Sequence, residues 1–574
     1  MIRHADFAAR DAIVREIGIS PYVASVMVNR GIRTPDEARR FLSPSLLDIH
    51  DPFLMKDMDL AADRLAQAVI GREKIVVFGD YDVDGIAASI VVRDFIQSIG
   101  VTCECHIPDR LTEGYGLNDE AVREYAARGF NLMITVDCGV KAVETVALAR
   151  SLGMDVIVTD HHETGEELPP ANAVVDPMRA DCSYPFKRLA GVGVAYKLIW
   201  ALSTRLSGGP KVYEGFRKYL IDALPIVALG TVCDVVPLLG ENRVLVKHGL
   251  EGMAKCSNIG LMSLMEEAGI LSRLSRDNRA VSVRDVAFSL GPRINAAGRM
   301  GSADTALALL SSTDSSKCWE LSKKLADFNK QRQELEADML QQAVADVRAL
   351  PAIPSAIMLA REEWHQGVLG IVASRVVGHF YRPTFLAVNE GEVTRGSARS
   401  IEGFDIVKCL TASESLLEHF GGHAGAAGFT VRTENLDKLR EEVNRYADAV
   451  FAENPKLLVP VVTIEAELPF RAINPQFVHQ LHQLEPFGHE HERPLFCAMG
   501  VSVAGEPRLV GANNQHIVMM LNHEGTSFRS IAFNRPCNLS AISSRINVLF
   551  YPKLDNYLGV PNVQLEIVDF RNAN

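Results

Sequence analysis

The stretch Lys74–Phe95, KIVVFGDYDVDGIAASIVVRDF, sets the fold class of the first half of this 574-residue chain. Its opening letters, KIVVF, are rich in β-branched residues and predict a short buried strand. Its closing letters predict an apolar helix. Between the two, Asp80, Asp82 and Asp84 stand at alternate positions. Because like charges this close repel one another, fold stability alone gives no reason to gather them.

The pattern D-x-D-x-D-G is also the beginning of an EF-hand calcium loop. Such a loop needs a bidentate Glu at its twelfth position. Counting from Asp80, that position is Val91. An EF-hand loop also follows a helix, whereas KIVVF predicts a strand. The sequence therefore argues against a calcium loop and favours an acidic turn between a strand and a helix.

The strand-then-helix unit recurs downstream. NLMITVDCG predicts a strand that ends at Asp137, and MDVIVTDHHE predicts one that ends at Asp160. LNDEAVREYAARG predicts a helix with Asn118 as its N-cap and Gly129 as its stop. Strands alternating with helices predict an α/β fold, a parallel sheet with helices on both faces.

In such sheets, ligands bind outside the carboxyl ends of the strands. The polar residues that follow these strands should therefore converge in space: Asp80, Asp82, Asp84, Asp137, His161 and His162. The alternative, in which each residue only caps a helix or lies in a loop, is stronger for a single member such as Asp160 than for the set.

Several buried carboxylates cannot all ionise together without cations. Oxygen ligands with one or two imidazoles suit Mn²⁺ or Mg²⁺ better than structural zinc, which prefers thiolates. A carboxylate-rich site commonly holds two metals, ~3.5–4 Å apart, which activate water for an in-line displacement at phosphorus. The pattern therefore predicts two divalent cations and phosphoester hydrolysis.

Three of these motifs, DYDVDG, VDCG and TDHH, resemble the successive motifs of the DHH phosphoesterase superfamily, and GTVCDVVPL resembles a fourth that supplies Asp234. RGSARS and HFGGHAGAAGF resemble the accessory DHHA1 domain. With AGVGVAYKL and GPRINAAGRM, the chain is similar to the single-strand-specific 5′→3′ DNA exonucleases of this superfamily. The resemblance runs from about Lys74 to the C-terminus.

The resemblance implies roles for the matching residues. The catalytic set is Asp80, Asp82, Asp84, Asp137, His161, His162 and Asp234. All of these except His162 would ligate the metals, with Asp80 as a ligand or as support for one, and Asp137 would bridge the two ions. His162 would be a ligand, orient one, or contact the scissile phosphate. Ser397 and Arg399 would contact the 5′ phosphate, and Arg110 would lie near the 5′ end.

Two further substrate contacts rest on residue chemistry. Arg293 stands beside small residues in GPRINAAGRM, where it can pair with a phosphate. The alternative is a helix junction with solvated arginines. His423 stands among glycines whose amides can face an anion, and the alternative is a glycine-rich helix-packing turn.

The same patterns divide the chain. Residues 1–50 are expected to form an N-terminal helical segment, 51–320 the DHH catalytic domain, and 351–455 a smaller α/β DHHA1 domain. Residues 321–350 are long, charged and free of Gly and Pro, which predicts an exposed connecting helix. From about Val459 the alternation turns to period two, so 456–574 are expected to form a β-barrel, an OB-fold. OB-folds bind single strands, although the turn GANNQH carries no lysine.

The bulk composition bounds the setting. The net charge of −12 alone argues against a nucleic-acid partner, but a local basic groove outweighs net charge. No apolar run is long enough to span a membrane, and the N-terminal residues do not form a signal peptide. Ten cysteines without a CxxC pair predict reduced thiols in a cytoplasmic protein, with a zinc site at Cys103 and Cys105 as the alternative.

The leading hypothesis is therefore a metal-dependent exonuclease that degrades single-stranded DNA 5′→3′ in repair and recombination. The resemblance implies a cytoplasmic protein that works with a helicase and a single-strand-binding protein. The sequence leaves the oligomeric state open, and a monomer is the default expectation. One alternative is another DHH phosphodiesterase, acting on oligoribonucleotides or cyclic dinucleotides. Such relatives are usually shorter and lack a C-terminal barrel. The other alternative is a non-catalytic single-strand-binding scaffold, which loss of metal ligands would mark.

Overall fold

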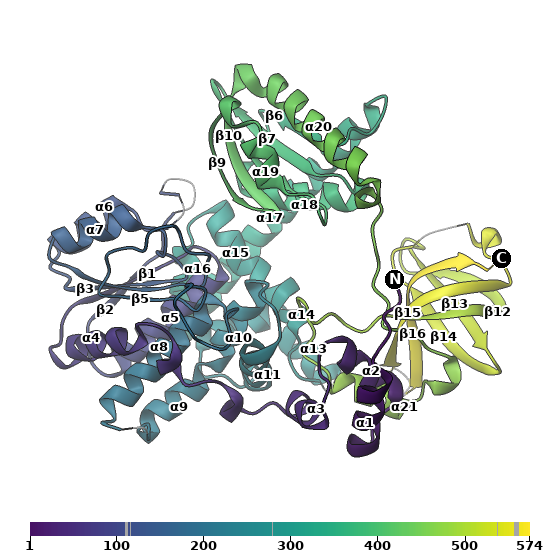
Figure 1. Ribbon diagram of the computed structural model, residues 1–574, viewed down its shortest axis with the longest axis horizontal. Helices are drawn as coiled ribbons and strands as arrows, with labels where there is room; N and C mark the ends of the chain where they lie inside the picture. The colour runs from purple at the N-terminus through teal and green to yellow at the C-terminus, as the bar shows by residue number, and fades with distance from the viewer. Residues whose placement is uncertain are drawn as a thin grey trace.

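The computed structural model describes residues 1–109, 113–114, 116–209, 211–277, 279–535, 538–555 and 562–573. Figure 1 shows three lobes. The first contains a parallel sheet, the second a smaller mixed sheet, and the third a β-barrel beside which both chain termini lie. Among the helices of the described residues, none combines the length and apolar character needed to cross a bilayer.

The first lobe is built on a five-stranded parallel sheet of order β2-β1-β3-β4-β5. Val76 and Phe78 of β1 pack under α6 and α7, whereas Ile75 and Val77 pack under α4, α5 and α8. The predicted α/β fold with helices on both faces is confirmed. The bounds are β1 (Ile75–Gly79), β2 (Cys103–His106), β3 (Leu132–Val136), β4 (Asp155–Thr159), β5 (Ala173–Val175), α4 (Met58–Ile70), α5 (Val83–Ser98), α6 (Asp119–Ala127), α7 (Val143–Ser151) and α8 (Gly191–Leu206).

The strand order creates a switch point. The chain leaves β1 for the edge strand β2 and then returns to the other side of β1 to form β3. Ligands of open α/β sheets bind where the order reverses in this way. Eight further segments complete the lobe: α9 (Glu214–Asp222), α10 (Leu224–Cys233), α11 (Gly240–Met253), α12 (Ile259–Glu267), α13 (Ile270–Asp277), α14 (Val283–Asp285), α15 (Gly291–Met300) and α16 (Asp304–Ser311). A π-helical turn, η3 (Val286–Leu290), lies between α14 and α15.

The helix α17 (Ser315–Ala349) joins the first lobe to the second. It begins six residues before the predicted start and is not exposed on all sides. Leu325, Met339, Ala343 and Val347 form part of a buried stripe. The stripe has the usual spacing of three or four residues, but its apolar character was hidden because polar residues occupy four of its positions: Ser322, Asn329, Arg332 and Glu336.

The second lobe holds a five-stranded mixed sheet of order β6-β7-β8-β10-β9. The glycine-rich HFGGHAGAAGF forms the hairpin of β9 and β10, so the helix-packing turn considered above is wrong. Gly421 and Gly428 face each other across this hairpin. The bounds are β6 (Ile357–Arg361), α18 (Leu369–Phe380), β7 (Thr384–Glu390), β8 (Val393–Arg399), α19 (Ile406–Thr411), β9 (Leu417–His423), β10 (Ala426–Arg432) and α20 (Leu436–Glu453).

The third lobe is a barrel in which β12, β13, β14, β16 and β15 pair in sequence and β15 pairs back to β12. This closed five-stranded barrel confirms the predicted β-barrel. Its elements are β11 (Ala466–Glu467), α21 (Pro475–His482), β12 (Phe496–Val510), β13 (His516–His523), β14 (Thr526–Ala532), β15 (Arg545–Asp555) and β16 (Asn562–Asn572).

The N-terminal helices share the barrel's core. Ile13, Val23 and Met27 lie in one buried cluster with Phe470 and Phe550 of the third lobe. These helices are α1 (Phe7–Ile17), α2 (Pro21–Asn29) and α3 (Pro35–Leu42). The two ends of the chain are therefore one folding unit, although more than 400 residues separate them in sequence.

Polar contacts fix this packing. Arg30 donates from Nη2 to Glu465 Oε1 at 3.2 Å, and Asn29 donates from Nδ2 to the same carboxylate at 3.0 Å. Both charged side chains are almost fully buried. Breaking one partner would leave the other charge uncompensated, so the pair fixes how the helices sit.

We expect Met27→Ala to destabilise the barrel by about 2–5 kcal/mol, because a buried side chain is truncated. Hydrogen exchange should show faster exchange of amides in β12–β16, with β1 and β3 unchanged. Arg15→Ala, on the exposed side of α1, is the control. Unchanged protection of the barrel in Met27→Ala would contradict the shared core.

Candidate metal centre

The acidic turn after β1 is held by the amides at the start of two helices. Asp82 caps α5, and its Oδ1 accepts from the amides of Asp84 at 2.8 Å and Gly85 at 3.1 Å. Asp84 is buried in the first turn of α5. Its carboxylate accepts from the amides of Gly191 at 2.6 Å and Val192 at 3.1 Å, the first two of α8. Helix N-termini stabilise negative charge, so both carboxylates are held and oriented by these amides.

Asp137 directly follows β3 with a left-handed backbone, φ 61°. It lies against the start of α8, where a Cβ on Gly191 would come within 2.4 Å of Asp137 Oδ1. Gly191, the first glycine of AGVGVAYKL, is therefore required for this close approach. Gly230 plays the same part beside Asp84, because its Cβ would lie 2.7 Å from Asp84 Oδ1.

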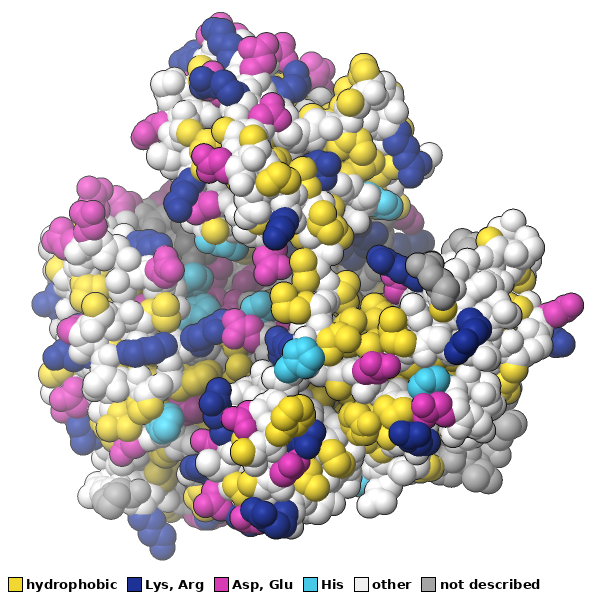
Figure 2. Space-filling view, turned by 45° about the vertical axis from the view of Figure 1, so that its right-hand side comes forward, with side chains coloured by type: hydrophobic (Ala, Val, Ile, Leu, Met, Phe, Trp, Pro, Cys, Tyr) yellow, Lys and Arg dark blue, Asp and Glu magenta, His cyan; other side chains and the backbone are white. Residues whose placement is uncertain are grey.

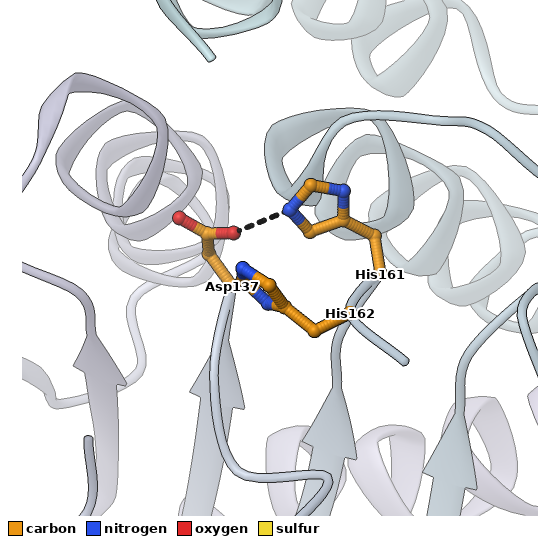
Figure 3. A group of neighbouring side chains, drawn as sticks. All are labelled: Asp137, His161 and His162. Carbon is orange, nitrogen blue, oxygen red and sulfur yellow. Dashed lines mark ion pairs between the residues drawn. The ribbon is translucent and has the colours of Figure 1, made fainter. Parts of the chain in front are cut away.

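His161 and His162 follow β4, and Figure 3 shows the ring of His161 facing Asp137 from the neighbouring strand end. His161 Nε2 lies 3.0 Å from Asp137 Oδ1 and 3.7 Å from Asp234 Oδ2. Asp160 contacts both histidines. Its carboxylate contacts His162 Nδ1 at 2.7 Å and accepts from the amides of His161 and His162.

Three of these atoms are buried and have no hydrogen-bond partner among the described residues: Asp137 Oδ1, His161 Nε2 and Asp234 Oδ2. The 3.0 Å approach between the first two is close enough, but its geometry is not that of a hydrogen bond. An unsatisfied buried polar atom costs about 1–3 kcal/mol, more when charged. Orphaned oxygens and an imidazole nitrogen facing one another are what a divalent cation satisfies.

The potential ligand atoms fall into overlapping groups of three within 4.8 Å of one another: Asp80, Asp82 and Asp137; Asp84, His161 and Asp234; and Asp137, His161 and His162. Asp137 belongs to two of these groups. Asp234 ends α10, where the helix dipole disfavours negative charge. The donor set is rich in oxygen and therefore fits Mn²⁺ or Mg²⁺.

Burial and mutual repulsion raise the pKa of these carboxyls. Burial, followed by the charges of Asp137 and Asp234, raises the pKa of Asp84. Burial, followed by the charge of Asp82, also raises the pKa of Asp137. The pKa of His161 is also raised: burial alone would lower it, but Asp234 and Asp84 outweigh that effect. Without metal the cluster retains protons, which metal binding must displace.

Two acidic residues of this region lay outside the predicted set. Asp160 positions His162, and the pKa of its carboxyl is lowered because contacts from His162 and from the Val140 amide outweigh burial. Asp176 follows β5 and is fully buried, with Oδ2 unpartnered among the described residues. Burial raises the pKa of Asp176 to about 7. The sequence signal was weak, since NAVVDP holds only three apolar residues before the aspartate.

The predicted substrate contacts lie in different places. Ser397 and Arg399 lie on β8, and Arg399 and His423 both pair across the sheet with Ala426. Residues paired across an antiparallel sheet project to the same face, so these three side chains share one face. Gly370 of α18 makes room there, because its Cβ would lie 2.6 Å from Arg399 Nη2.

Arg293 is engaged elsewhere. It donates to Glu267 at 2.8 Å and to the carbonyl of Ser289 at 2.8 Å. The arginine of the same motif that lines a cavity is Arg299, in a space of ≈ 190 Å³ beside Cys233. Arg110 lies outside the described residues. The nine cysteines that the structure describes are free, and no cluster there suited to a metal includes a cysteine, which leaves the zinc alternative without support.

Family models match three segments of the chain. The DHH family N-terminal domain matches residues 74–231, the DHHA1 domain residues 352–449, and the RecJ OB domain residues 464–569. Between them, the three models account for each of the lobes described above.

Named relatives cover nearly the whole chain. It is 37% identical over 562 residues to the single-stranded-DNA-specific exonuclease RecJ of Bacillus subtilis, a match that covers 97% of this chain and 69% of that protein. It is 34% identical to that of Escherichia coli, with 90% and 89% covered. Among solved structures, RecJ of Thermus thermophilus in complex with Mn²⁺ superposes with a TM-score of 0.83 at 30% identity, over 99% of this chain and 78% of that one.

The raised pKa values predict how stability without metal depends on pH. Because Asp84, Asp137, Asp234 and His161 have raised pKa values in the fold, the folded protein binds more protons than the unfolded chain at neutral pH. In EDTA, the Tm should fall as the pH rises from about 5 to about 8. Mn²⁺ should raise the Tm more at the higher pH, since fewer protons are displaced. Scanning calorimetry tests this, and a Tm in EDTA that rises over this range would contradict it.

Proposed function

Because this chain belongs to the RecJ family of single-stranded-DNA-specific exonucleases, we infer that it is a metal-dependent exonuclease that degrades single-stranded DNA 5′→3′ in repair and recombination. The observation that carries the chemistry is the set of buried, orphaned ligand atoms at the switch point of the parallel sheet. Figure 2 shows histidine and acidic side chains gathered in a recess between the first and second lobes.

We propose that Asp80, Asp82 and Asp137 hold one cation. Asp84, His161 and Asp234 would hold the other. Asp137 would bridge the two ions, since it belongs to the first group and its Oδ1 lies 3.0 Å from Nε2 of His161 in the second. When bound, the pair lowers the pKa of a water and stabilises negative charge on the phosphate. The protein's own part is to hold these carboxylates in register through the amides of α5 and α8.

His162 has a separate role in this proposal. Its side chain is 43% exposed, against 10% for His161. Asp160 fixes its ring through Nδ1 and raises its pKa despite burial. A protonated imidazole held this way would donate from Nε2 to the scissile phosphate or to the departing oxygen.

The part of the second sheet's face that lies beside α18 would receive the 5′ end. Ser397 and Arg399 offer a hydroxyl and a guanidinium on one strand, and His423 lies two strands away in the same row. Ala426 lies between Arg399 and His423, and Gly428 and Gly421 continue the row of Ser397 without side chains, which leaves the surface flat. We propose that this face contacts the 5′ phosphate, with Arg110 also near it.

Within the proposal, residues 51–320 carry the chemistry, 321–350 connect, 351–455 recognise the 5′ end, and 456–574 hold the strand, while the helical segment 1–50 packs against the barrel. We further propose a cytoplasmic monomer that works with a helicase and a single-strand-binding protein. The free cysteines among the described residues support the proposed cytoplasmic location. The barrel counts against a hydrolase of short oligoribonucleotides or cyclic dinucleotides, and the full ligand set counts against a non-catalytic scaffold.

Asp137→Ala should abolish Mn²⁺-dependent release of nucleotides from a labelled single strand. The Tm of the metal-free variant should stay the same or rise, because a repelling carboxylate is removed. Asp338→Ala, exposed on α17, is the control. Near-normal turnover by Asp137→Ala would contradict the two-metal assignment.

Arg399→Ala should weaken binding of a 5′-phosphorylated strand by about tenfold to a hundredfold, as expected for a lost charged hydrogen bond. Unphosphorylated strands should lose much less. Arg395→Ala, on the same strand and face, is the matched control. Binding is measured in Ca²⁺ to suppress cleavage. An equal loss on both kinds of end would mean a general backbone contact instead.

A further inference from the structure

A groove of ≈ 1170 Å³ runs between the first lobe and the barrel lobe. Val232, Val235 and Ala287 line both this groove and the small cavity beside Cys233 that Arg299 also lines. Since Asp234 lies between Cys233 and Val235, the groove begins next to the metal centre. The barrel lobe contributes Arg493, Tyr551 and Pro552 to its lining.

Two apolar side chains stand exposed along this route. Phe288 is 74% exposed and Val235 is 62% exposed. Val235 has φ 63°, a left-handed conformation that costs a β-branched residue free energy. The turn directs Asp234 toward His161 and Val235 into the groove. The strained backbone of Val235 therefore sets the positions of both side chains. Phe288 stands on the π-helical turn η3, a deviation frequent at functional sites.

Each lobe contributes to the groove an aromatic ring with an arginine against it. The Arg284 guanidinium lies 5.6 Å from the centroid of Phe288, and that of Arg493 lies 4.3 Å from Tyr551. Proteins that bind single strands without sequence preference combine such rings with cationic side chains. Figure 2 shows hydrophobic side chains gathered between the recess and the barrel lobe.

Acidic residues also line the groove, namely Glu251, Glu485 and Glu492. A uniformly basic channel would track phosphates. This mixture instead favours bases on the apolar surface, with the phosphates turned toward the arginines or toward solvent.

We propose that this groove carries the single strand from the barrel to the metal centre, and that Phe288 is a stacking platform for one of its bases. This rests on the proposed function. The occupant is single-stranded DNA because the groove joins the metal centre to the barrel, and because its aromatic rings and arginines match that chemistry. Val235 packs against the base nearest Asp234.

The test combines a protein change with a substrate change. Phe288→Ala should weaken binding of a strand of about twelve nucleotides, measured in Ca²⁺, by about fivefold to a hundredfold. Phe288→Tyr should retain binding, because the ring remains. The log–log salt slope should stay the same, since no phosphate contact is lost. Phe7→Ala is the matched control: Phe7 is 66% exposed with the Arg10 guanidinium 4.7 Å from its ring, but it lies on α1.

A single abasic site moved along the strand locates the stacked base. In the unaltered protein, one position should weaken binding most, and Phe288→Ala should remove the sensitivity at that position alone. The proposal is overturned if Phe288→Ala binds as tightly as the unaltered protein, which is the result expected if the groove takes a protein segment. It is also overturned if every abasic position remains as costly in Phe288→Ala. Failure of the unaltered protein to degrade single strands with Mn²⁺ would instead reject the proposed function.

Discussion

Repulsion among carboxylates at the ends of β1 and β3 is the constraint on which this structure depends. Backbone amides at the start of two helices offset this repulsion. The first turn of α5 holds Asp82, and the first turn of α8 holds Asp84. Helix amides stabilise negative charge without adding a competing positive side chain. The cluster therefore stays open to a cation, whereas a buried arginine at the same place would have filled it.

This constraint explains which parts of the site the sequence could predict. Parallel strands bring their carboxyl ends to one edge, so a polar residue directly after a strand has a predictable place. Asp80 and Asp137 follow this rule, and His161 comes one residue later, after Asp160. Asp234 does not, because it ends a helix, and only the family resemblance brought it into the set. Asp176 follows the rule but was missed, since β5 has only three residues and gives little periodic signal.

The elements that sequence could not place are those joined by distant contacts. Nothing in the first 50 residues shows that their apolar face belongs to a barrel at the other end of the chain. The contacts that decide it, Arg30 with Glu465 and Met27 with the core around Phe470, are tertiary. In the same way, glycines in β9 and β10 concealed the hairpin. A strand interior rarely tolerates glycine unless another surface must approach closely, and here they leave a flat sheet face beside Arg399.

Backbone strain connects the chemistry to the strand's route. Asp137 and Val235 both adopt left-handed conformations that L-residues avoid, and both adjoin the metal centre. Each turn points a carboxylate inward at a place where a relaxed chain would not. At Val235 the same turn also leaves an apolar side chain in the groove that leads to the barrel. The position of Asp234 and the shape of the groove are therefore set together. A substitution that relaxed this turn would disturb both at once, which is why the groove is better probed at Phe288, on a separate helical turn that carries none of the ligands.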